Sequence, residues 1–118
     1  MKRTIIFYRT VNNKCPVKNF LDSLSGKVSQ KVTWVLSLIE DIDIVPSKYF
    51  KKLIGTKEIW ECKVRIGSDS YRIFCFFYSN SLLVLTHGHI KKTQKVPIAE
   101  IRRAERYRDD FIRRKRNE

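Results

Sequence analysis

Residues 87–97 of this chain carry side chains that could transfer protons and bind phosphate. The segment reads HGHIKKTQKVP, holds both histidines of the protein, and directly follows the apolar run of residues 82–85. Imidazoles exchange protons near neutral pH, and lysine ammonium groups neutralise phosphate oxygens and the added charge of a phosphoryl transition state. The combination suits chemistry on a nucleic-acid backbone.

The two histidines allow more than one interpretation. His87 is the leading acid–base candidate, and the alternative is a hydrogen-bonded core histidine at the end of an apolar strand. His89 shares the strand parity of His87 if the strand continues past Gly88, which makes it a second proton-transfer candidate or a ring that stacks on a base.

The residues after the histidines are predicted to meet phosphate as a cluster. Lys91 and Lys92 are the catalytic candidates, and Thr93 and Lys95 are expected to bind substrate. A lysine cluster is often only a solvated face, but the strongly basic chain favours phosphate contact.

Arg72 interrupts the otherwise apolar run of residues 71–78. A guanidinium binds phosphate through two parallel hydrogen bonds, so Arg72 is the first candidate for stabilising the scissile phosphate. The structural alternative is an ion pair with Glu61 or Glu58, because buried charges are normally paired.

Three further side chains could extend this site. Lys63 and Arg65 alternate along one strand face and could lengthen a basic groove, or Glu61 could neutralise them in a salt bridge. Tyr78 lies next to a turn and is the aromatic residue best placed to stack on a base. The other aromatics, Trp60, Phe74, Phe76 and Phe77, have the spacing of strand-core residues.

Composition favours a polyanionic partner. The chain has 118 residues, with 25 Lys and Arg against 12 Asp and Glu, a formal net charge of +13. Charge of this size steers a protein toward phosphates, and the alternative is a role in solubility or in meeting an acidic protein. Neither the cysteines nor the carboxylates show metal-ligand spacing, so we expect no metal and no cofactor. The apolar runs are too short for a signal peptide or a membrane span, so a soluble, cytoplasmic protein is expected.

Periodicity predicts one α+β domain over residues 1–118, with a frayed basic tail at 112–118. The predicted sheet is antiparallel, with an N-terminal strand at residues 4–9, a helical hairpin, a three-strand meander and a C-terminal helix from Pro97. The hairpin begins at Pro16, and its second helix has an apolar stripe from Val28 to Ile42. The meander strands are expected at 59–66, 71–78 and 82–86, and residues 48–55 form a connection.

The element order and four sequence blocks resemble the RelE/ParE toxin superfamily, and within it the HigB-like, phage-derived branch. The blocks are KLIG at 52–55, IWECKV at 59–64, YRIF at 71–74, and LTHG followed by KKTQKVP between residues 85 and 97. The resemblance covers about residues 3–111. Where the branch commonly has a Gly-Phe pair before the lysines, this chain has Gly88 and His89.

The resemblance implies a RelE-like fold and the toxin of a type II toxin–antitoxin pair, encoded beside a helix-turn-helix antitoxin. It further implies a ribosome-dependent endoribonuclease that cuts mRNA in the A site. Two other functions stay open. The same superfamily resemblance allows a ParE-like toxin that inhibits DNA gyrase by protein binding, and the basic residues allow a non-enzymatic module that binds RNA or the ribosome. Codon preference, oligomeric state, and the division between general base and general acid stay open as well.

Overall fold

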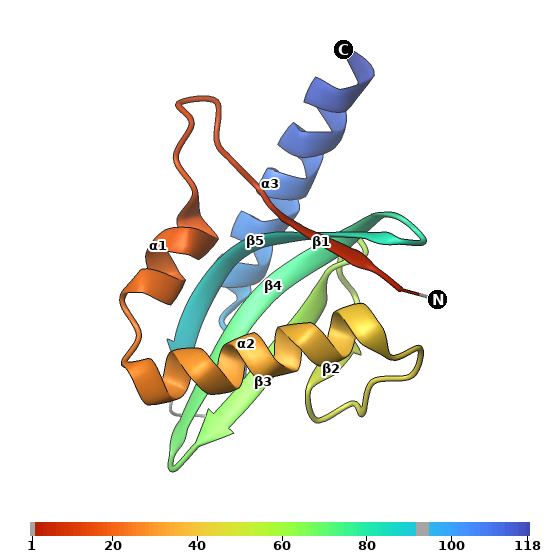
Figure 1. The fold of residues 1–118 in the computed structure, drawn as a ribbon. Coiled ribbons are helices and arrows are strands. Elements are labelled where there is room, and N and C mark those ends of the chain that lie inside the picture. The colour runs from red at the N-terminus through yellow and green to blue at the C-terminus, as the bar shows by residue number, and fades with distance from the viewer. Residues whose placement is uncertain (1, 92–94) are drawn as a thin grey trace.

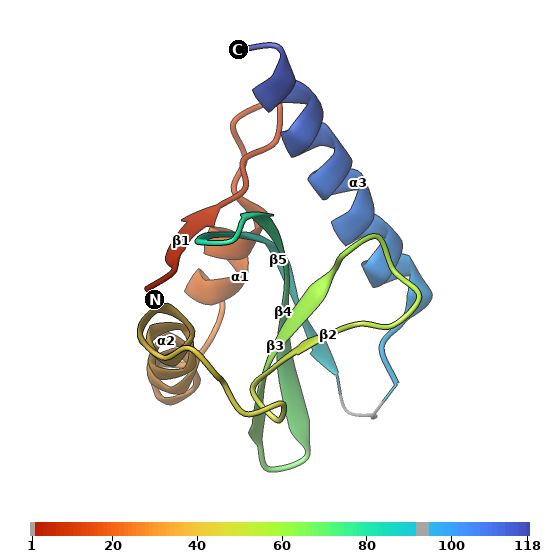
Figure 2. The same cartoon turned by 90° about the vertical axis from the view of Figure 1, so that its right-hand side faces the viewer.

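A computed structural model describes residues 2–91 and 95–118 of the chain. A five-stranded sheet forms the middle of three layers, with α1 and α2 on one face and α3 on the other (Figures 1 and 2). In chain order the elements are β1 (Thr4–Phe7), α1 (Pro16–Asp22), α2 (Gly26–Asp41), β2 (Phe50–Lys52), β3 (Trp60–Ile66), β4 (Asp69–Ser79), β5 (Leu82–Lys91) and α3 (Ile98–Arg116).

The sheet is mixed, which corrects the prediction of an antiparallel sheet. Its strand order is β1-β5-β4-β3-β2, and β1 runs parallel to β5, with Thr4 opposite Leu82 and Phe7 opposite Leu85. The other three pairings are antiparallel. Parallel pairing requires a long crossover between the strands, and here the chain from β1 to β5 includes both α1 and α2.

The helical hairpin forms where the sequence predicts it. Pro16 begins α1, because its fixed φ angle suits the first helical position. Ser25 caps α2 by accepting a hydrogen bond from the backbone N–H of Val28. At the other end of α2, the Arg3 guanidinium donates to the carbonyl oxygens of Ile39 and Ile42 at 2.7 and 2.8 Å. This contact ties the start of the chain to the end of the helix.

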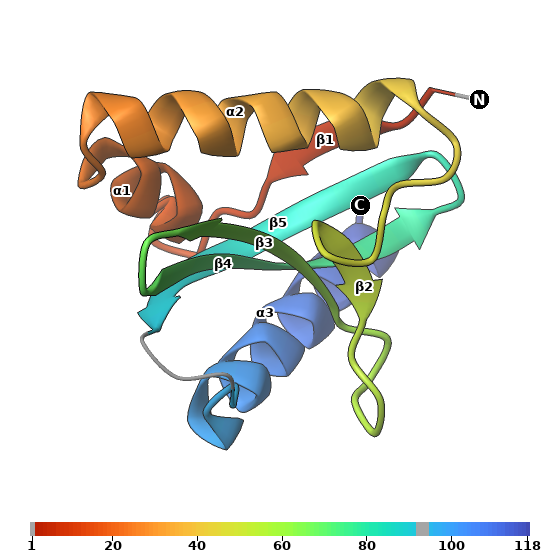
Figure 3. The ribbon, with the colours of Figure 1, turned by 90° about the horizontal axis from the view of Figure 1, so that it is seen from below.

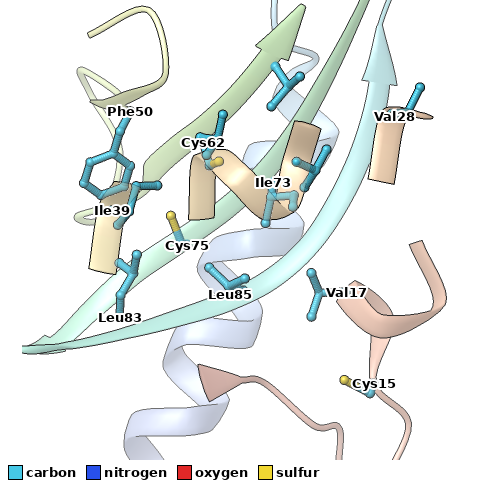
Figure 4. Close-up of a cluster of buried hydrophobic side chains, with 13 residues drawn as sticks. Cys15, Val17, Val28, Ile39, Phe50, Cys62, Ile73, Cys75, Leu83 and Leu85 are labelled. Atoms are coloured by element: carbon cyan, nitrogen blue, oxygen red, sulfur yellow. The ribbon is translucent and has the colours of Figure 1, made fainter. Parts of the chain in front are cut away.

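Two hydrophobic clusters hold the layers together. The first lies between α1, α2 and the sheet, and the view from below shows α2 lying along that face (Figure 3). Figure 4 shows its side chains, which include Val17, Ile39, Cys62, Ile73 and Leu85. The second cluster joins the opposite face of the sheet to α3, and its buried members are Tyr8, Ile59, Phe74, Phe76, Val84, Ala104 and Phe111.

Three elements differ from the sequence prediction. Residues 50–52, expected within a connection, form the edge strand β2. β5 extends to Lys91, five residues past the predicted end at Thr86, so the histidines lie within a strand. Helix α3 continues to Arg116, whereas residues 112–118 were expected to fray.

Candidate functional site

A β-bulge decides which face of the sheet the histidines occupy. In the pairing of β4 with β5, Phe74 lies opposite His87 while Cys75 lies opposite Leu85, so Thr86 is an extra residue on β5. Leu85 packs in the cluster under α1 and α2. Side chains alternate between faces, and one inserted residue exchanges the faces. His87 therefore lies on the α3 face, where its ring contacts Phe74 and Tyr107.

Beyond the bulge, three strands align five basic side chains in two neighbouring rows on the α3 face of the sheet. Lys63 of β3 lies opposite Arg72 of β4, which lies opposite His89 of β5. The next row holds Arg65, Ser70 and Lys91 in the same strand order. Directly opposed residues have Cβ atoms about 4.5–5.5 Å apart. We call these five basic side chains and Ser70 the basic rows.

Arg72 is the buried member of the basic rows. Its side chain is 2% exposed and forms an ion pair with Glu61, which is buried on β3. This is the structural alternative that the sequence left open for Arg72. Because Glu61 offsets its charge, Arg72 contributes less to the surface field than the partly exposed or exposed Lys63, Arg65 and Lys91.

His89 is held by a carboxylate from the first turn of α3. Its Nδ1 lies 2.9 Å from Oε2 of Glu100, and its side chain is 29% exposed. A carboxylate can only accept in this hydrogen bond, so Nδ1 carries a proton, and in the neutral form of the ring Nε2 holds the lone pair. His89 is thus an oriented, accessible imidazole in the same row as Arg72 and Lys63.

His87 is buried and neutral. Burial, together with the positive charge of Arg103, lowers the pKa of its imidazole to about 3. Nε2 lies 3.9 Å from Oε1 of Glu100, but a neutral ring makes this contact no ion pair at pH 7. The side chain is 1% exposed, so a substrate on the basic rows does not reach it.

The hydrogen bonds of Thr86 define the tautomer of His87. The Thr86 hydroxyl donates to the carbonyl oxygen of Phe74 at 3.0 Å, and its oxygen lies 3.1 Å from Nδ1 of His87. Since the single hydroxyl proton is used on Phe74, Nδ1 must donate to the hydroxyl oxygen. Nε2 of His87 is therefore an acceptor, and it has no hydrogen-bond partner in the described part of the chain.

The remaining predicted site residues divide between three places. Tyr78 packs edge-on against Phe111, near the opposite end of β4 from the basic rows, and is not brought together with them. Lys95 is exposed just before α3. Lys92 and Thr93 lie outside the described residues.

Glu100 is the site residue that the sequence analysis missed. It contacts both histidines, but the connection between β5 and α3 separates it from them in the sequence. An acidic residue in the first turn of a helix is common, because it complements the helix dipole, so its presence alone carried no functional signal.

The described residues contain neither a metal-binding cluster nor a membrane-spanning helix. Within 2–91 and 95–118, no group of three or more His, Cys, Asp or Glu side chains could hold a metal ion. Over the same residues, no helix has the length and apolar character needed to cross a membrane.

Comparison with known proteins identifies the family. A comparison with curated proteins gives no match. A family model described as phage-derived protein Gp49-like (DUF891) matches residues 19–109. The matched span contains the bulge, both basic rows and Glu100, and it covers more than half of the chain. The chain therefore belongs to the Gp49-like family of phage-derived proteins.

Proposed function

We propose that this protein is the toxin of a type II toxin–antitoxin pair and that it cleaves mRNA in the ribosomal A site without a metal ion. The observation that carries the proposal is the alignment of the basic rows beside the His89–Glu100 pair. Together these residues offer phosphate-binding cations and one oriented proton acceptor on a single face. Because the mRNA would be cut on the ribosome, the protein would act in the cytoplasm.

The charge of the molecule supports a nucleic-acid substrate. The net charge of +13 attracts phosphate from a distance, and the basic rows give that attraction a defined place. Lys63 and Arg65 come from β3 and Lys91 from β5, so a phosphate above β4 would meet cations from both sides. A rigid sheet holds these cations before the substrate arrives, which is the condition for effective electrostatic catalysis.

The chemistry follows from the His89 tautomer. Nε2 of His89 removes the proton of a ribose 2′-OH, and the 2′-oxygen attacks the adjacent phosphorus. The bond from phosphorus to the 5′-oxygen breaks, and the leaving oxygen takes a proton from water, which leaves a 2′,3′-cyclic phosphate on one fragment and a 5′-hydroxyl on the other. His89 then releases its proton to solvent, which neutralises the hydroxide. Lys63, Arg65 and Lys91 stabilise the charge on the phosphate oxygens. Glu100 stabilises the imidazolium that forms on His89.

The roles of two predicted catalytic residues change in this proposal, and a third keeps its role. Arg72 holds β3 and β4 together through Glu61 and adds positive charge beneath the substrate. His87 supports the site from the buried layer and does not transfer the proton. Lys91 keeps its predicted place at the phosphate.

The family and the sequence likeness support the toxin role. The chain belongs to a phage-derived family, and its blocks at 52–55, 59–64 and 71–74 resemble the HigB-like branch of the RelE/ParE superfamily. The α+β layers with α3 over one face of the sheet are compatible with the RelE-like fold that this resemblance implies.

The proposed partner is a small helix-turn-helix antitoxin with an acidic segment that covers the basic rows. Occupying these cations would block RNA, and complementary charge would mainly accelerate association. Stopped-flow association rates should therefore fall steeply as salt concentration rises. Equal rates at low and high salt would exclude this charge-steered mode of binding.

The test is to express the chain alone and map RNA 5′ ends. We expect growth arrest and new 5′ ends within translated codons, weakened in Lys91→Gln. The matched control is Lys115→Gln, which also removes one lysine charge. Lys115 lies near the C-terminal end of α3, about 25 Å along the helix from the first turn that contacts the histidines. Intact mRNA with altered DNA supercoiling would instead indicate a gyrase-inhibiting toxin. RNA binding without any cleaved product would indicate a non-enzymatic module.

A further inference from the structure

A cavity of about 390 Å³ lies at the edge of β5, and the proposed cleavage site does not use it. Three separate segments line the cavity: the loop before α1 together with α1, the middle of β5, and the first half of α3. Lys14 and Phe20 come from the first segment, His87 and Gly88 from β5, and Arg103 and Tyr107 from α3.

The cavity exists because β1 covers only half of β5. Their pairing ends with Phe7 opposite Leu85, and within the described chain no strand pairs with residues 86–91 on that side. Phe20 packs against this free edge at Gly88, where an added Cβ would lie 2.1 Å from the Phe20 ring. A side chain at position 88 would therefore displace the aromatic wall of the cavity.

The charges around the cavity select an anion. Lys14 and Arg103 both line it, and none of its described lining residues is acidic. Arg103 is held in place, because its Nε donates to the Tyr107 hydroxyl at 3.0 Å and its guanidinium lies over the Tyr107 ring. A phosphate is the common biological anion that suits a lysine and an arginine together.

The aromatic lining of the cavity favours a ligand that has a planar ring. Phe20 is the aromatic wall that can meet a base, because Tyr8 stacks on the Tyr107 ring and the Arg103 guanidinium lies over it. Unstacked bases of single-stranded RNA stack on such side chains. His87 also supplies a hydrogen-bond acceptor, since its Nε2 lone pair is buried and has no partner among the described residues. An exocyclic amino group of a base could donate to this nitrogen.

We propose that this cavity is a nucleotide subsite, which holds one base and its phosphate next to the cleavage site. The proposal rests on the proposed function for its substrate, an RNA strand. His87 and His89 lie two residues apart on β5, about 6.6 Å along the strand, so the cavity adjoins the basic rows. Its volume lies at the low end of the range for small-ligand sites, which fits one nucleotide.

The first experiment measures binding of nucleoside 5′-monophosphates to the full chain by calorimetry. Arg103→Gln should weaken binding by about tenfold or more, because a charge-assisted hydrogen bond is lost. The matched control is Arg106→Gln, which removes the same charge from an exposed position on α3 outside the cavity. It should change binding by no more than about twofold, within the small effect of an exposed charge.

A second comparison separates base from phosphate. Base stacking on aromatic side chains should make a nucleoside monophosphate bind at least about fivefold more tightly than inorganic phosphate. Equal binding of both would reduce the site to an anion site and overturn the nucleotide proposal. Lys14→Gln is a second binding variant that should preserve the fold, because Lys14 is exposed on a loop.

The nucleotide subsite and the nuclease can fail separately. If the wild-type protein cleaves no RNA but binds nucleotides in a manner that depends on Arg103 and Lys14, the subsite stands and the nuclease does not. If ribosome-bound mRNA is cleaved while both variants bind and cleave like the wild type, the subsite is wrong.

Discussion

Oε2 of Glu100 lies 2.9 Å from Nδ1 of His89, a contact that joins the first turn of α3 to the last part of β5. The carboxylate holds the ring with Nδ1 toward it, which leaves Nε2 as the nitrogen for the proposed proton abstraction. Oε1 of the same carboxylate lies 3.9 Å from Nε2 of His87. One acidic side chain therefore contacts the accessible imidazole and the buried one.

His89→Ala should lower the rate of mRNA cleavage by about 10²–10⁴, the usual contribution of acid–base catalysis. Glu100→Gln should lower it by roughly 10², because the amide no longer stabilises the imidazolium. Single-turnover cleavage on programmed ribosomes measures both rates. In the double variant the losses should not multiply, since Glu100 acts through His89. Fully multiplicative losses would show that the two residues act separately.

His87→Phe should leave the cleavage rate at saturating substrate nearly unchanged and should make the fold less sensitive to acid. The folded-state pKa of His87 is about 3 and the ordinary value is 6.5, so between these pH values the unfolded chain binds more protons. Wild-type stability should therefore fall as the pH drops from about 6.5 to about 3, with His87 contributing up to about 1.4 kcal/mol for each pH unit.

Urea unfolding across this pH range measures the effect. The phenyl ring keeps the contacts with Phe74 and Tyr107 but has no group that titrates. His89→Gln is the control that should retain the acid dependence caused by His87. If a stably folded His87→Phe protein did not cleave mRNA at saturating substrate, His87 and not His89 would be the residue that transfers the proton.

Arg72→Ala should destabilise the fold by about 3–5 kcal/mol, because it leaves the Glu61 carboxylate buried without its cation. The double variant Arg72→Met with Glu61→Leu removes both charges and should recover most of that stability. Urea denaturation of the single and double variants tests this difference. Cleavage by the stable double variant then shows whether the Arg72 charge acts on the substrate. A single variant as stable as the wild type would rule out a structural role for the pair.

Tyr8→Phe should cost about 1.5 kcal/mol, because the Tyr8 hydroxyl donates a 2.6 Å hydrogen bond to Asp110. Burial and this carboxylate raise the pKa of Tyr8 to about 12. Between about pH 10 and 12 the unfolded tyrosine loses its proton while the folded one keeps it, so wild-type stability should decrease over that range. Thermal unfolding at pH 7 and at pH 11 should show a smaller pH effect in Tyr8→Phe. Tyr78→Phe serves as the control, since Tyr78 is exposed.

The sequence was sufficient to predict the elements whose residues alternate or recur regularly. The stripe of Val28, Val32, Val35 and Ile39 predicted α2, and all four are buried. The alternation of Trp60, Cys62 and Val64 predicted β3. The three residues of β2 are too few to show a period, and they form a strand because β3 lies beside them.

The candidate site was only partly predictable, because two of its determinants are tertiary. The bulge at Thr86 depends on the register between β4 and β5. Without it, the side chain of His87 would lie on the same face of the sheet as that of Leu85. Glu100 meets His89 only after α3 packs on the sheet. Sequence spacing does place Lys63 and Arg65 on one face of a strand, and it identifies Lys91 as a member of a lysine cluster. It cannot show that three strands place them in adjacent rows.

The parallel pairing of β1 with β5 has a consequence for the order of assembly during synthesis. Residues 4–7 leave the ribosome well before their partners at 82–85, which are made almost eighty residues later. Contacts between such distant parts of a chain form slowly, because a long loop must close first. β1 cannot pair until β5 has been made, and His89 cannot contact Glu100 until the first turn of α3 has been made. Under the proposed function, a nascent chain should therefore be unable to cleave mRNA on the ribosome that is making it until α3 has emerged.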